Sequence, residues 1–265
     1  MSTSTIESRP AILRGTAQRK QLELEQREGL FMDCALDMLE ASGFSGLTLE
    51  KLATRTNFSK GTVYNHFTSK EDLFTALCVR GMQMQMAMFS ALQAFEGSTR
   101  ERMMGMHYAY HLYAQRHPTL FMCVLTGLSP HVVEKTSARR MADRQRLEAR
   151  VTERVDTLVR EAVAAGDLRL PPGTTVADIS FAHWAVSFGT TALLQSAQQA
   201  TSIRRLEVPE AFRRNVTLLL DGMGWTPLST VQDDRDTWRR LGEVFRLTAE
   251  PTPRDTAAAA GPVMA

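Results

Sequence analysis

The chain reads LEKLATRTNFSKGTVYNHFTSKEDL from Leu49 to Leu73. Two short helical segments flank a turn at residues 56–58, and a residue suited to N-capping precedes each one: Thr48 before the first and Ser59 before the second. Two helices joined by a turn of about three or four residues can present the second helix to the major groove of DNA while the first braces it. The stretch therefore predicts a helix-turn-helix.

The second segment, residues 60–66, has the side chains that a groove-reading helix needs. Gly61 removes a side chain where the helix start approaches the duplex, and Val63 and Phe67 are left to face the core. Five polar side chains supply hydrogen-bond donors and acceptors: Lys60, Thr62, Tyr64, Asn65 and His66. A helical hairpin with a solvated polar face is the alternative interpretation.

Helical periodicity continues on both sides of this stretch. Apolar side chains recur at helical spacing from Gln21 to Ser42, and Gly43 ends that segment because glycine adopts positive φ freely. Downstream, Ser69–Asp72 reads as a capping box with aspartate in place of the usual glutamate, and opens a longer helix. Residues 21–80 are therefore predicted to form a helix-turn-helix domain of three helices and a connector.

The segments Leu49–Ala53 and Phe58–Leu73 together resemble the DNA-binding signature of the TetR (tetracycline-repressor) family. The turn, the glycine, the aromatic pair and the following lysine all occur in register, and the resemblance covers about residues 25–80. One departure is Thr56–Phe58, where the family commonly has a small residue, glycine and valine. Asparagine tolerates positive φ, so we expect Asn57 to replace the glycine.

The resemblance also implies roles for individual residues. Phosphate contacts position a DNA-binding protein, whereas base contacts specify the sequence. The residues expected to hold phosphates are Thr48, Tyr64, His66 and Lys70. Those expected nearest the base edges are Lys60, Gly61, Thr62 and Asn65.

The rest of the chain is also predicted to be helical, because alternating β-branched runs are scarce and no long repeat recurs. Further helices are expected over 134–165, 174–199, 209–223 and 234–245. We predict an all-α protein in four parts: a flexible N-terminal arm (1–20), the helix-turn-helix domain (21–80), a helical-bundle effector-binding and dimerisation domain (81–225), and a C-terminal extension with a short helix and a disordered tail (226–265).

Methionine and aromatic residues crowd the second domain, which by the resemblance binds a small effector. Flexible thioether side chains can repack around varied apolar ligands. The candidate effector-binding residues are Met86, Met104, His107, Tyr108, His111, Phe121, Met122, His183 and Trp184. Plain core packing is the alternative for each of them. His107 and His111 have a metal-ligand spacing, but no acidic or cysteine partner accompanies them, so no metal or cofactor is predicted.

The resemblance implies that the helices at 174–199 and 209–223 build the interface of a homodimer. Small and apolar residues in these helices permit close helix approach: Ala182, Ala185, Gly189, Ala192, Leu193, Leu218 and Leu219. The two reading helices would then meet successive major grooves, about 34–36 Å apart. Packing within one subunit is the alternative role for the same residues.

Composition narrows the function classes. The net charge of +2 is weak evidence for a polyanionic partner, so the case for DNA depends on the local motif. No run is apolar enough for a membrane span, and Cys34, Cys78 and Cys123 show neither disulfide nor zinc spacing, which favours an intracellular, cytoplasmic protein. No catalytic motif such as GxSxG, HExxH or a phosphate loop is visible, so no catalytic residue is assigned and no enzyme is expected.

Together these patterns predict a ligand-responsive transcriptional regulator. We expect a repressor that binds a palindromic double-stranded operator as a homodimer and is released by a small, largely apolar effector. A transcriptional activator would use the same DNA-binding and effector-binding parts, so activation of transcription is an alternative to repression. A helical interaction protein without specific DNA binding, or an enzyme, are the alternatives.

Overall fold

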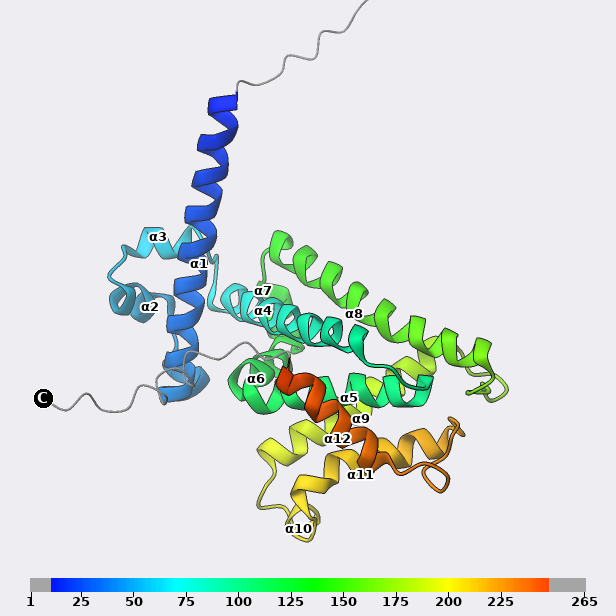
Figure 1. The fold of residues 1–265 in the computed structure, drawn as a ribbon. Helices are drawn as coiled ribbons and strands as arrows, with labels where there is room; N and C mark the ends of the chain where they lie inside the picture. Colours follow the sequence, from blue (N-terminus) through cyan, green and yellow to red (C-terminus); the bar gives the residue numbers. More distant parts are fainter. Residues whose placement is uncertain (1–10, 248–265) are drawn as a thin grey trace, which may run out of the picture. The chain divides into compact units, whose positions relative to one another are not determined.

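The computed structural model describes the backbone of residues 11–247 and the side chains of residues 18–246. Every regular element within these residues is a helix, so the predicted all-α fold is confirmed (Figure 1). The chain forms two compact units. The first holds residues up to Cys78 together with Met122–Ala142, and the second holds Val79–Phe121 together with residues from Asp143 onward.

The first unit contains the predicted helix-turn-helix. Helices α2 (Leu49–Thr56) and α3 (Lys60–Tyr64) lie beside the long α1 (Ala11–Gly46), and α4 (Lys70–Ala91) begins here (Figure 1). Gly43 interrupts the helical geometry of α1 with φ 65° and ψ −174°, in agreement with the expected end of the first helix.

The described structure divides the chain differently from the predicted parts. Residues 11–20 are helical rather than a flexible arm, because alanine, leucine, arginine and glutamine in this segment are strong helix formers. Residues 1–10 of the expected arm and 248–265 of the expected tail lie outside the described residues. Residues 122–142, expected in the second domain, group with the first unit, and the described part of the C-terminal extension groups with the second.

The remaining helices are η1 (Leu92–Ala94), α5 (Thr99–Arg116), α6 (Pro118–Gly127), α7 (Pro130–Lys135), α8 (Ala138–Ala165), α9 (Val176–Ser196), α10 (Thr201–Arg204), α11 (Val208–Gly222) and α12 (Asp234–Leu247). The helix expected from residue 134 begins at Ala138, since Thr136 is extended (φ −82°, ψ 138°) and separates α7 from α8. Gly166 follows α8 with φ 79°, as its role as a helix stop requires.

The second unit has its core around α5, against which α9, α11 and α12 pack (Figure 1). Arg100, fully buried at the start of α5, fixes the C-terminal extension in place: its guanidinium lies 2.9 Å from a carboxylate oxygen of both Asp221 and Asp234 and donates to the Trp225 carbonyl at 2.8 Å. The extension is therefore an integral layer of this unit. No helix among residues 11–247 is both long and apolar enough to span a membrane.

Candidate nucleic-acid interface

Side-chain caps shape the helix-turn-helix as predicted. Thr48 is extended and accepts a hydrogen bond from the Lys51 N–H at 3.2 Å, and Ser59 accepts one from the Thr62 N–H at 3.1 Å. Between the two helices, Asn57 has φ 57° and ψ 32°. The expectation that asparagine adopts positive φ in this turn is confirmed.

Apolar contacts fix which face of α3 points inward. Val63 and Phe67 are completely buried, and Phe58 in the turn packs edge-on against Phe31 with ring centroids 5.2 Å apart. Rotation of α3 would expose these side chains to water, so the opposite face is held outward. The predicted residues Lys60, Gly61, Tyr64 and Asn65 are all exposed on α3 and its C-terminal cap.

Gly61 is not required by the fold. A Cβ atom built at this position would meet only the Ser59 Oγ, at 3.8 Å, which is an ordinary van der Waals distance. Its backbone is helical, so positive φ is not the reason for glycine either. The missing side chain therefore leaves room outside the chain, where a partner can approach the backbone. Thr62, half-buried beside it, shares a 2.8 Å hydrogen bond with the Ser59 hydroxyl.

Tyr64 is bonded to an acidic residue of the bracing helix. Its phenolic hydroxyl donates to the Glu50 carboxylate at 2.8 Å, and both side chains are exposed. This hydrogen bond lowers the pKa of Glu50 and raises the pKa of Tyr64, so Glu50 is anionic beside α3 at neutral pH. Sequence reasoning did not single out Glu50, which lies in the first turn of α2 and contacts the reading helix through Tyr64.

Two of the predicted phosphate-binding residues point into the first unit. The His66 ring is 9% exposed and packs edge-on against Phe31 at 5.2 Å, with Nδ1 3.6 Å from a Glu28 carboxylate oxygen. Its position three residues after Val63 is the signal that places it on the buried face. The Lys70 ammonium donates to the Phe44 carbonyl, and its partial burial lowers the pKa of that ammonium.

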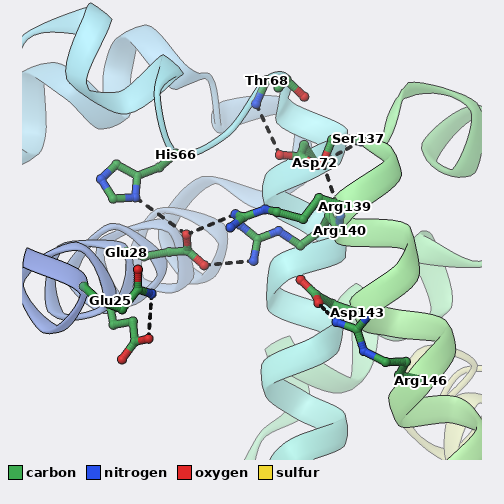
Figure 2. Close-up of polar contacts among 11 residues, drawn as sticks. Glu25, Glu28, His66, Thr68, Asp72, Ser137, Arg139, Arg140, Asp143 and Arg146 are labelled. Carbon is green, nitrogen blue, oxygen red and sulfur yellow. Dashed lines mark hydrogen bonds and ion pairs between the residues drawn. The ribbon is translucent and has the colours of Figure 1, made fainter. Parts of the chain in front are cut away.

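Glu28 joins three elements of the first unit (Figure 2). Besides His66, its carboxylate contacts the Arg140 guanidinium at 2.8 Å and the Arg139 guanidinium at 4.0 Å. Arg140 is buried and its guanidinium also lies over the Phe67 ring at 5.7 Å. These residues tie α1 and the end of the reading helix to the start of α8.

A second polar contact connects the first turns of α4 to the residues between α7 and α8. The Asp72 carboxylate accepts from the Thr68 N–H at 3.2 Å, and from the N–H and hydroxyl of Ser137 at 3.0 and 2.6 Å (Figure 2). Ser69 donates to the Lys135 carbonyl at 2.9 Å. Half of the predicted capping box is present, because Ser69 accepts from the Asp72 N–H at 3.0 Å, but the Asp72 carboxylate bonds Thr68 instead of Ser69.

The predicted effector-binding residues form separate groups. His107 and His183 are buried and share a 2.8 Å hydrogen bond, and His107 also bonds the Ser187 hydroxyl at 2.6 Å. Among the described residues, His183 Nε2 and His111 Nδ1 are buried without a hydrogen-bond partner. Burial lowers the pKa of His107 well below its usual value and the pKa values of His111 and His183 to about 4.

The other predicted effector residues are more scattered. Tyr108 and His111 surround Trp238 of α12, with ring centroids 4.7 and 6.3 Å from it. Met104 and Phe121 are fully buried, Met86 is half-buried, Met122 falls in the first unit, and Trp184 is exposed. A groove of 610 Å³ in the second unit is lined by none of these nine residues. Within the described side chains, no group of three histidine, cysteine, aspartate or glutamate residues forms a metal site.

The predicted dimer helices expose apolar side chains. Leu218 of α11 is 69% exposed, and Phe181 and Leu193 of α9 are 63% and 55% exposed. α9 and α11 pack on each other, and Asn215 donates to the Thr190 hydroxyl across them at 3.1 Å. Of the other predicted interface residues, Ala185 is exposed and the rest are half-buried: Ala182, Gly189, Ala192 and Leu219.

The sequence of the helix-turn-helix matches a known family. Residues 31–77 match the family described as bacterial regulatory proteins, tetR family. The helix-turn-helix of this chain is therefore similar to that of the tetR family of bacterial regulatory proteins. The match supports the predicted DNA-binding transcriptional regulator.

Known proteins and solved structures match the chain over most of their own length. The chain is 29% identical over 157 residues to the nucleoid occlusion factor SlmA of Marinobacter nauticus, which covers 57% of this chain and 74% of SlmA. A TetR/AcrR-family transcriptional regulator from Thermobifida fusca superposes with a TM-score of 0.56 at 22% identity, over 74% of this chain and 98% of its own. The transcriptional regulator FadR from Bacillus subtilis, solved in complex with stearoyl-CoA, superposes with a TM-score of 0.55 at 16% identity. The superposition covers 72% of this chain and 97% of FadR.

Proposed function

We propose that this chain is a TetR-family repressor that binds a palindromic operator as a homodimer and is released by a small, largely apolar effector. The observation that carries the DNA-reading part is the outward face of α3, where Gly61 is open and Lys60 and Asn65 are exposed. These side chains suit base edges in the major groove, since lysine donates to guanine and asparagine pairs with adenine. Thr48, Thr62 and Tyr64 flank them.

His66 and Lys70 take a different part in this proposal. Both have partners within the first unit: the His66 ring lies 3.6 Å from the Glu28 carboxylate, and the Lys70 ammonium donates to the Phe44 carbonyl. A phosphate would have to replace these partners to engage the two side chains. We assign them to holding the reading helix first, with phosphate contact as a second role.

The homodimer is supported by the apolar face of α9 and α11. Exposed leucine and phenylalanine side chains, such as Leu218 and Phe181, cost free energy in water and are stabilised when a second copy covers them. A two-fold dimer presents two identical reading helices, which is why the operator is expected to be palindromic. The expected site of action is the cytoplasm, where such DNA lies.

Release by an effector follows from a ligand that binds one state of the dimer more tightly than the other. The second unit supplies an apolar interior rich in methionine, and the family fold includes FadR, whose structure contains stearoyl-CoA. The coupling is proposed to run along α4 and α8, since each helix begins in the first unit and continues in the second. Binding without turnover is expected.

A second candidate function is a role on the chromosome other than transcription, which the likeness to the nucleoid occlusion factor SlmA favours. Both candidate functions are tested by selecting, from a random pool of DNA duplexes, those that the full chain binds. Enrichment of a palindrome located in promoters is expected for a repressor. Enrichment of the same motif away from promoters favours the second candidate, and enrichment of no motif contradicts specific reading of DNA.

A further inference from the structure

The groove of 610 Å³ lies entirely within the second unit, and its walls come from three places in the chain. Its apolar lining includes Phe89 at the end of α4, Phe95 after η1, Met106 of α5 and Leu158 of α8. All four are buried apolar side chains. The volume falls in the range of small-molecule sites, about 300–1,000 Å³.

The charged groups that line the groove are Glu96, Arg102, Arg154 and Glu161. Arg102 and Glu161 form an ion pair at 2.7 Å, so they compensate each other. Glu96 is exposed, and water can solvate its carboxylate. Arg154 is half-buried and, among the described residues, forms no ion pair; its guanidinium reaches only the Phe89 carbonyl, at 3.5 Å.

Arg154 is thus the group in the groove that lacks compensation. A guanidinium carries five N–H donors in a planar fork that matches a carboxylate, and one long bond to a carbonyl leaves most of them without a protein acceptor. Partial burial removes some of the water that would otherwise solvate the charge. An anion at Arg154 would both neutralise the charge of the guanidinium and accept hydrogen bonds from its N–H donors.

We infer that this groove binds an amphiphilic carboxylate, with the carboxylate on Arg154 and the apolar part along Phe89, Met106 and Leu158. The inference extends the proposed function, because it gives the effector a place and a chemical class. Arg154 and Phe89 lie on α8 and α4, the two helices that begin in the first unit. A ligand bound at Arg154 and Phe89 would therefore contact both α4 and α8, the two helices that continue from the first unit.

The test uses the full chain without DNA and isothermal titration calorimetry with decanoate, kept below its micelle-forming concentration. Decyltrimethylammonium, with the same chain and the opposite charge, tests the head group. Arg154→Gln removes the charge from the groove. Arg160→Gln is the matched control, since Arg160 is exposed on the same helix, does not line the groove and pairs with Glu153.

Decanoate is expected to bind the parent and Arg160→Gln equally and to lose at least about tenfold in affinity for Arg154→Gln, while the cationic analogue binds none of them detectably. No decanoate binding at millimolar concentration, or equal binding to Arg154→Gln, overturns the inference. Unchanged thermal unfolding of Arg154→Gln confirms that the variant is folded.

Leu158→Trp provides a second variant, because a larger side chain fills the apolar part of the groove without changing its charge. Leu158→Trp is expected to lower the affinity for decanoate. An unchanged affinity contradicts the assigned position of the decanoate alkyl chain. Failure of the proposed function is seen separately, in a titration of the selected duplex. If decanoate binds as expected and leaves DNA affinity unchanged, the site stands and release by this ligand class is refuted.

Discussion

Glu50 places a negative charge beside the helix that is proposed to read DNA. The Tyr64 hydroxyl donates to its carboxylate at 2.8 Å, which keeps the phenol directed at α2. Phosphates would be repelled by this carboxylate, and Tyr64 must leave it to reach them. We therefore expect Glu50 to weaken nonspecific binding to the DNA backbone.

Glu50→Gln keeps an oxygen for Tyr64 but removes the charge. We expect affinity for any duplex to rise about threefold at low salt, with the gain falling as salt is added, because the effect is electrostatic. Fluorescence anisotropy at two salt concentrations measures it. Glu207→Gln, at an exposed position of the second unit, is the control. An unchanged or lower affinity of Glu50→Gln for DNA would show that Glu50 does not oppose phosphate binding.

His111 tests the pH dependence of the second unit. Burial lowers the pKa values of His111 and His183 to about 4, below the usual value of about 6.5. The unfolded chain then binds more protons than the folded chain as the pH falls below about 6.5, so the free energy of unfolding decreases in that direction. Between pH 7 and pH 5 the loss is about 2 kcal/mol for each such histidine.

His111→Phe keeps the ring stacked on Phe212, whose centroid lies 4.3 Å away, and removes the titrating group. Denaturant unfolding at pH 7 and pH 5 is expected to show a smaller loss of stability for this variant than for the parent. His131→Gln, at an exposed histidine, should behave like the parent. An identical pH dependence in His111→Phe would contradict the account.

At the residue level, the sequence predicted helix caps and backbone conformation, but it did not predict contacts between residues far apart along the chain. The caps at Thr48 and Ser59 and the positive φ of Asn57 follow from residue type and position, and the structure confirms them. The polar partner of His66 is Glu28, 38 positions earlier along the chain, and Glu28 in turn pairs with Arg140. A single sequence contains no signal for such pairs.

At the scale of elements, the first turns of α4 are fixed to the residues just before α8. Asp72 is buried, and its carboxylate accepts three hydrogen bonds, from Thr68 and Ser137. Asp72→Ala removes these hydrogen bonds, and a typical hydrogen bond within a protein contributes about 0.5–1.5 kcal/mol to stability. We expect lower stability of the first unit, measured by hydrogen exchange of its amides.

Asp143→Ala is the control for this change, since Asp143 lies on α8 and forms an ion pair with the exposed Arg146 (Figure 2). Equal exchange in Asp72→Ala and the parent would show that these bonds contribute nothing. The bounds predicted for α8, α9, α11 and α12 lie within a few residues of the observed ones, because periodicity and stop signals are local. The break at Thr136, which creates α7, was missed because no glycine or proline marks it.

At the scale of the whole molecule, the proposed dimer depends on side chains that one chain leaves exposed. Leu218→Asp puts a charge on the apolar face of α9 and α11, where Leu218 is 69% exposed. Burying an unpaired carboxylate in an interface is unfavourable, so we expect monomers in sedimentation velocity, with unchanged helicity. Leu206→Asp, at an exposed leucine outside both helices, should remain a dimer. A monomeric parent would remove the basis for a palindromic operator.

The most direct test of the DNA-reading account is a titration of the enriched duplex and of a shuffled duplex with the parent, Lys60→Ala and the control Arg205→Ala, followed by fluorescence anisotropy. The account predicts that Lys60→Ala loses about tenfold or more in affinity for the enriched duplex, while Arg205→Ala, an exposed arginine of the second unit, binds like the parent. Equal loss on both duplexes would assign Lys60 to phosphate contact. Unchanged binding of the enriched duplex by Lys60→Ala would contradict the assignment of the outward face of α3 as the surface that reads DNA.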